Sequence, residues 1–182
     1  GKEPQNRFNI ATDVLKDFIQ SRQYDRVSLV VFGKESFLQF PLTLDYGVML
    51  KILDQMKIGD INGSGTAIGN ALAMSLARLQ ESEAKSKLII LLTDGEDNGS
   101  NISPRELADE AKRREIPIFP ILVGTDDQSW SPTDMVDIST GLRRYQKVDH
   151  PVNPALLKEI AKVTEGDFYR AADPDSLKED FQ

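Results

Sequence analysis

Five consecutive aliphatic residues, Leu88 to Leu92, lead directly into Thr93, Asp94 and Gly95. A short apolar run that is bounded by a turn signal is typical of a strand covered on both faces, as in a parallel sheet. Aspartate followed by glycine favours a turn at the end of such a strand. This segment therefore predicts a buried strand that delivers the Asp94 carboxylate to one edge of a sheet.

Apolar residues at helical spacing alternate with short β-rich runs along the rest of the chain. The alternation predicts an α/β fold in which a doubly wound, mostly parallel sheet has helices on both faces. No linker or repeat divides residues 1–182, so we expect a single domain. The predicted helices are 6–20, 46–56, 66–79, 104–115, 154–166 and one from 173, and the predicted strands are 27–32, 37–40, 88–92, 116–123 and 168–171.

Several residues predict where these elements begin and end. Asp45 is a predicted N-cap, and Ser103 to Glu106 reads as a capping box with proline at the first helical position. Pro41 is expected to end the second strand, because proline cannot donate to a ladder. Residues 125–149 are polar without a clear period, and we expect a long loop or a small hairpin there.

Composition excludes several classes of function. The 182 residues carry a net charge of −7, which gives no electrostatic footprint for nucleic acid. The chain has no cysteine and only one histidine, His150. Disulfide scaffolds, thiol nucleophiles, cysteine-ligated zinc and multi-histidine metal sites are therefore excluded. No apolar run approaches the roughly 18 residues that a membrane-spanning helix needs.

Two polar segments lie at predicted element ends. Gly65 to Gly69 opens a predicted helix and places the Thr66 hydroxyl at its start, while Asp94 follows the Leu88–Leu92 strand. Ligands of open parallel sheets bind at the carboxyl ends of strands. Hydroxyl and carboxylate oxygens without histidine or cysteine favour a hard cation such as Mg²⁺, Mn²⁺ or Ca²⁺.

A purely structural interpretation of the same residues also stands. Thr66 would then be only a helix N-cap, and Asp94 only a former of the turn at Gly95. Glu96, Asp97 and Asn98 are expected to be solvated turn residues.

The two motifs together resemble a von Willebrand factor A (VWA) domain. They are Gly65-Thr66-Ala67-Ile68-Gly69 at a helix start and Leu88-Ile89-Ile90-Leu91-Leu92-Thr93-Asp94-Gly95 at a strand end. Three further segments are similar to the bacterial Bat-type (aerotolerance) branch of that family: residues 25–32, 41–45 and 161–166.

The resemblance implies a metal-ion-dependent adhesion site (MIDAS). Thr66 matches the threonine that ligates the ion directly, and Asp94 matches the aspartate that acts through a water. Mg²⁺ is the expected ion, with Mn²⁺ and Ca²⁺ as alternatives, and no catalytic residue is implied. The family's Asp-x-Ser-x-Ser loop and its first, central strand are not found in this sequence. We therefore expect a sheet that lacks that strand, and weak or no metal binding by this chain alone.

The resulting functional hypothesis is a protein-binding module whose cation is completed by a Glu or Asp of a partner. The resemblance implies a membrane-associated bacterial stress or aerotolerance assembly, with other Bat-type proteins and a MoxR-type AAA+ ATPase as partners. It also implies an extracytoplasmic, periplasmic domain of a protein anchored in the inner membrane.

Two alternatives remain open at this point. One is a Mg²⁺-dependent phosphoester hydrolase or phosphotransferase, in which Asp94 is a ligand or nucleophile and Glu96 or Asp97 assists. The other is a structural VWA scaffold with a degenerate metal site. Trp130 and Tyr145 are candidate interface anchors, or residues that pack onto the domain.

Overall fold

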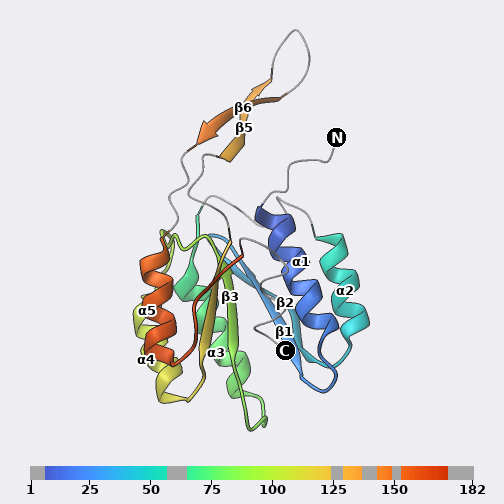
Figure 1. The fold of residues 1–182 in the computed structure, drawn as a ribbon, viewed down its shortest axis with the longest axis vertical. Helices are drawn as coiled ribbons and strands as arrows, with labels where there is room; N and C mark the ends of the chain where they lie inside the picture. The colour runs from blue at the N-terminus through green and yellow to red at the C-terminus, as the bar shows by residue number, and fades with distance from the viewer. Residues whose placement is uncertain (1–6, 57–64, 124–128, 137–142, 149–152, 172–182) are drawn as a thin grey trace.

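The computed structural model describes residues 7–56, 65–123, 129–136, 143–148 and 153–171. Helices and strands alternate along these residues (Figure 1). The elements are α1 Arg7–Gln20, β1 Val27–Phe32, β2 Ser36–Thr43, α2 Tyr46–Gln55, α3 Ile68–Gln80, β3 Ile89–Thr93, α4 Pro104–Arg113, β4 Ile118–Leu122, β5 Ser129–Val136, β6 Arg143–Val148, α5 Pro154–Thr164 and β7 Tyr169–Arg170.

A parallel sheet of β3, β4 and β7 forms the centre of the fold. Strand β4 alternates between two apolar clusters, since Ile118 and Leu122 pack with α3, α4 and α5 while Ile121 packs with Val14 of α1. Figure 1 shows α1 on the opposite side of this sheet from α5. The predicted α/β fold with a parallel sheet and helices on both faces is therefore confirmed.

Strands β1 and β2 form a separate antiparallel pair. Among the described strands, no ladder hydrogen bond joins β1 to β3. Every residue of β1 is only half-buried, although its sequence is almost entirely apolar. The apolar run 27–32 favours a strand buried on both faces. Val27 and Leu29 do pack in one cluster and Phe32 against another, but burial is only partial, because β2 is the only strand beside β1 among the described residues.

The ends of β1 and β3 nevertheless meet at one edge. The Ala67 amide donates to the Gly33 carbonyl just after β1 at 2.8 Å, and the amides of Asn98 and Gly99 donate to the Thr66 carbonyl at 3.0 Å. The residues that precede α3 thus bridge the loops that follow β1 and β3.

Some predicted ends are confirmed and others are wrong. Asp45 caps α2, since its Oδ1 accepts the Val48 amide at 3.0 Å. The predicted capping box does not form, because the Ser103 side chain makes no cap hydrogen bond, although Pro104 does begin α4. Strand β2 continues through Pro41 to Thr43, as an edge strand can accept a proline.

The C-terminal half follows the sequence pattern with small shifts. The hairpin expected within 125–149 is present as β5 and β6. The α5 helix ends at Thr164, and Glu165, at φ 60°, takes the left-handed position before Gly166. The helix predicted from residue 173 and the side chains of Trp130 and Tyr145 lie outside the described residues. None of the described helices is long and apolar enough to span a bilayer.

Candidate functional site

Thr66 and Asp94, the two residues predicted to bind metal, lie on segments that touch each other. Thr66 comes two residues before α3, and Asp94 directly follows β3. Both side chains are half-buried. The loop of residues 94–101, which we call the β3 loop, reaches back from Asp94 to the main chain of Thr66. The Thr66 segment and the loop after β3 therefore meet at one edge of the sheet.

Asn98 holds the main chain of Thr66 on both sides. The Thr66 amide donates to Asn98 Oδ1 at 2.8 Å, and the Thr66 carbonyl accepts the amides of Asn98 and Gly99, each at 3.0 Å. The Thr66 hydroxyl itself makes no hydrogen bond to any residue that the structure describes. It is thus available to a ligand.

The β3 loop also caps α3. Asp97 Oδ1 accepts the Ile68 amide at 3.0 Å, and Ser100 Oγ accepts the Gly69 amide at 2.7 Å. The Ser100 hydroxyl in turn donates to Asp97 Oδ1. Two of the amides that a helix start leaves unpaired are therefore satisfied by side chains about 30 positions away.

These contacts correct two sequence interpretations. Thr66 is not the N-cap of α3: that position is Ala67, and no side chain of the segment itself caps the helix. Asp97 and Asn98 are not merely solvated turn residues, because they bind the start of α3. No local sequence signal marks these roles, since the partners are 29 and 32 positions apart.

Asp94 is held in a tight turn. Its Oδ1 accepts the Glu96 amide at 3.3 Å, and its carbonyl accepts the Asn153 amide at 3.2 Å. Gly95 has φ +86°, and a Cβ there would lie 2.5 Å from the Asn153 carbonyl oxygen. Only glycine fits this position. The predicted Asp-Gly turn is confirmed, and it fixes the direction in which Asp94 leaves β3.

The donor set fits a hard divalent cation in kind. A neutral hydroxyl and a carboxylate are oxygen ligands of the type that Mg²⁺ and Ca²⁺ take. They are fewer than the ligands of a complete shell. No cluster of three or more His, Cys, Asp or Glu side chains in the described part of the chain would supply the others. Thr66 would bind such an ion directly and Asp94 through its carboxylate or a bound water.

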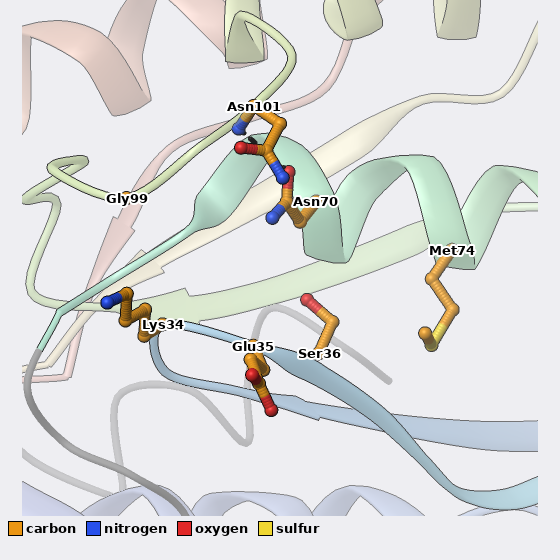
Figure 2. Close-up of a pocket in the computed structure, with 7 residues that line it drawn as sticks. All are labelled: Lys34, Glu35, Ser36, Asn70, Met74, Gly99 and Asn101. Atoms are coloured by element: carbon orange, nitrogen blue, oxygen red, sulfur yellow. Dashed lines mark hydrogen bonds between the residues drawn. The ribbon is translucent and has the colours of Figure 1, made fainter.

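A cavity of about 400 Å³ lies beside this edge (Figure 2). Lys34 closes one end near Gly65, where a Cβ would lie 3.7 Å from the Lys34 Cβ. Figure 2 shows the Ser36 hydroxyl directed toward α3 and the Glu35 carboxylate directed away from it. The Ser36 Oγ is buried and has no hydrogen-bond partner among the described residues. The lining residues are Lys34, Glu35, Ser36, Asn70, Met74, Gly99 and Asn101.

The von Willebrand factor type A domain model matches residues 4–182. The chain belongs to this family. An uncharacterized protein of Borreliella burgdorferi is 28% identical over 174 residues, and the match covers 96% of this chain and 50% of that protein. The VWA domain thus spans about half the length of this curated relative.

Solved structures place the fold among bacterial VWA domains. BatB from Bacteroides thetaiotaomicron superposes with a TM-score of 0.81 at 25% identity, covering 96% of this chain and 84% of that one. An aerotolerance-related membrane protein from Bacteroides fragilis gives 0.79 at 24% identity, covering 96% and 86%. The similarity to Bat-type proteins inferred from the sequence is confirmed.

A more distant structure carries a metal at the family's site. Proximal thread matrix protein 1 of the mussel byssus, described with a zinc-occupied MIDAS motif, has a TM-score of 0.70 at 21% identity. The match covers 96% of this VWA domain and 39% of the mussel chain. At this identity the likeness is one of fold.

Proposed function

We propose that this VWA domain is a protein-binding module that holds a divalent cation at Thr66 and Asp94. A Glu or Asp side chain of a partner protein would complete the coordination shell. Neutral hydroxyl ligands and water-mediated carboxylates leave such an ion electrophilic, so an incoming carboxylate binds it strongly. The chain's own part is to fix the direction of its two ligands and to leave the partner's side open.

One observation carries this proposal. The β3 loop, which begins at Asp94, hydrogen-bonds to the main-chain amide and carbonyl of Thr66, while the Thr66 hydroxyl forms no hydrogen bond with a described residue. A hydroxyl that served only as a helix cap would accept an amide of α3, and those amides go to Asp97 and Ser100 instead. This arrangement supports a ligand role for Thr66 over the cap interpretation.

The nature of the ion follows from the ligand type. Mg²⁺, Mn²⁺ and Ca²⁺ all prefer oxygen ligands. We propose Mg²⁺ first and keep Mn²⁺ and Ca²⁺ as alternatives. The zinc-bound MIDAS of the mussel protein supports a divalent cation in this fold without selecting one. Lys34, which forms no ion pair within the described residues, adds a positive charge beside the site for an acidic partner.

The proposed setting is a membrane-associated bacterial assembly. The Bat-type relatives support a role in stress or aerotolerance, with other Bat-type proteins and a MoxR-type ATPase as partners and a periplasmic location. An interaction module, and not an enzyme, is the role that the family favours. The hydrolase hypothesis is not carried further, because Asp97, one of its two assisting carboxylates, instead caps α3.

The experiment is a thermal unfolding series with and without Mg²⁺ on the wild type, Thr66→Ala and Asp94→Asn. A ligand that binds only the native state stabilises it by RT ln(1 + c/Kd), where c is the free ligand concentration, so the melting temperature rises with ligand concentration. Because the two ligands are fewer than a complete shell, we expect weak binding, so that Mg²⁺ at high concentration stabilises the wild type and neither variant. Asp109→Asn, an exposed change on α4, is the matched control and should keep the wild-type response.

The metal-free samples separate the two interpretations of Thr66. Loss of a helix cap lowers stability by about 1 kcal/mol. We expect Thr66→Ala to change it by less than about 0.5 kcal/mol, as for a surface substitution. A wild type that ignores Mg²⁺ and Mn²⁺, or a Thr66→Ala protein that still responds, would contradict the proposal.

A further inference from the structure

We infer that Asn98 is a positioning residue, which sets the direction of the Thr66 hydroxyl toward the metal. The metal part of this inference rests on the proposed function. The sequence interpretation gave Asn98 no role beyond a solvated turn, and its side chain is exposed. The role follows from its contacts alone.

Three hydrogen bonds fix the backbone of Thr66. Its amide is bound by the Asn98 side chain, and its carbonyl by the amides of Asn98 and Gly99. The next amide along the chain, that of Ala67, is bound by the Gly33 carbonyl at 2.8 Å. With the groups on both sides of its Cα held, Thr66 has little freedom in φ and ψ, and the direction of its Cα–Cβ bond is set.

The segment is shaped to admit the Asn98 amide. A Cβ at position 65 would lie 3.1 Å from Asn98 Oδ1, so a larger residue than glycine would crowd the carbonyl that accepts the Thr66 amide. Glycine at position 65 thus leaves room for Asn98, whereas a Cβ would require the Asn98 side chain to shift by a few tenths of an ångström. A carboxamide suits this place, because it accepts the amide without adding a further charge beside Asp94.

A hydroxyl on a held backbone binds a cation better than one on a mobile segment, because less conformational freedom is lost on binding. Removing a residue that orients a metal ligand typically weakens metal affinity about 10-fold to 100-fold. Asn98→Ala removes one of the three bonds and leaves both main-chain donors in place. We therefore expect about a tenfold weaker Mg²⁺ affinity, at the low end of that range.

The β3 loop supplies a matched control. Asn70 Oδ1 on α3 accepts the Asn101 amide at 3.0 Å, which is the same kind of bond between the same loop and the region of α3. It spans 31 positions, against 32 for the Asn98 bond, and does not touch Thr66. Asn70→Ala thus loosens the loop without releasing the proposed ligand.

The test measures two quantities on the wild type, Asn98→Ala, Asn98→Asp and Asn70→Ala. The first is hydrogen exchange of the Thr66 amide without metal, and the second is Mg²⁺ affinity by calorimetric titration. Asn98→Ala should speed the exchange of Thr66 and weaken Mg²⁺ binding about tenfold. Asn98→Asp retains an acceptor and should restore the slow exchange, while Asn70→Ala should change neither quantity.

Each contrary result has a distinct meaning. Mg²⁺ binding that needs Thr66 but is unchanged in Asn98→Ala, or is weakened equally by Asn70→Ala, overturns the positioning role and leaves the proposed function intact. A wild type without Mg²⁺ binding overturns the proposed function and the metal part of this inference together. If hydrogen exchange of the Thr66 amide is unchanged in Asn98→Ala, then Asn98 does not hold the Thr66 backbone, and the inference is wrong whether or not metal binds.

Discussion

Gly69 lies where α3 approaches the end of the β3 loop and Ile102, the residue after it. A Cβ at this position would lie 1.9 Å from the Ile102 carbonyl oxygen and 3.0 Å from Ser100 Oγ. Real atoms cannot approach that closely, so any side chain would push the loop away from the helix. The glycine of the motif at the helix start is thus needed for the packing that brings the two site segments together.

We therefore predict that Gly69→Ala lowers the free energy of unfolding by about 1–3 kcal/mol, the range for overpacking. Gly47 in α2 is the matched control, because the nearest atom to its Cβ would be 3.6 Å away. Gly47→Ala should be neutral or slightly stabilising, since alanine favours a helix. Urea unfolding measures both, and equal stabilities of the two variants would contradict the packing argument.

Thr164 is a second residue whose substitution should lower the stability of the fold. This buried side chain lies in α5 and binds β4, because its Oγ1 accepts the Ile118 amide at 3.0 Å and donates to the Ile160 carbonyl at 2.9 Å. Thr164→Val keeps the shape but leaves the Ile118 amide unpaired, which should lower stability by about 1–3 kcal/mol. Thr164→Ser keeps the bond and should lose less. Denaturant unfolding measures both variants, and a Thr164→Val protein as stable as Thr164→Ser, or more stable, would refute this prediction.

At the scale of elements, α4 has an acid-sensitive end. Glu110 accepts hydrogen bonds from Arg113 Nη2 at 2.5 Å and Arg114 Nε at 2.6 Å. These bonds lower the pKa of the Glu110 carboxyl below its usual 4.5, and the bond from Arg113 has the larger effect. A carboxyl whose pKa is lower in the folded state contributes stability above its unfolded pKa, and that contribution is lost as the pH falls through the folded value.

We predict that Glu110→Gln is less stable than the wild type at neutral pH, and that the difference disappears as the pH falls below 4.5. Added salt should shrink the neutral-pH difference, because Glu110 is half-buried at the surface and its ion pairs are partly screened. Asp109→Asn, the neighbouring change on the same helix, is the matched control, because it also removes a carboxylate but leaves the bonds of Glu110 to Arg113 and Arg114 in place. Thermal unfolding across the acid range gives the comparison, and a pH-independent difference would count against it.

At the scale of the whole molecule, the described strands form three separate sheets, and two of them, β1-β2 and β3-β4-β7, carry the apolar clusters. Strands β1 and β2 pack with α1 and α2 around Ile19, Phe40, Met49 and Leu53. Strands β3 and β4 pack with α3, α4 and α5 around a larger cluster. No strand-to-strand bond between described residues links the two parts. They are coupled by α1, whose Val14 packs with Ile121 of β4, by helix α3 and by the loops near Thr66.

This division predicts unequal local stability. Regions with fewer buried contacts open at lower free energy than the central core. Amides of β1 and β2 should therefore exchange hydrogen at lower opening free energy than those of β3 and β4. Native-state exchange in increasing denaturant measures the difference. A single opening energy for all four strands would show that the two parts unfold together.

Local residue patterns are enough to predict the elements and the two site motifs. The apolar runs predict β1, β3 and β4, the helical spacing predicts the buried face of α3, and the Asp45 cap and the Asp-Gly turn are correct because neighbouring residues form them. The tertiary structure decided what caps α3 and what holds Thr66. Those bonds join Asp97 and Asn98 to residues about 30 positions earlier, and a contact at that separation leaves no periodic or local signal. The degree of burial of β1 could not be predicted from the sequence either. An apolar run shows that a strand can pack against other elements, but it does not show how many strands will lie beside it.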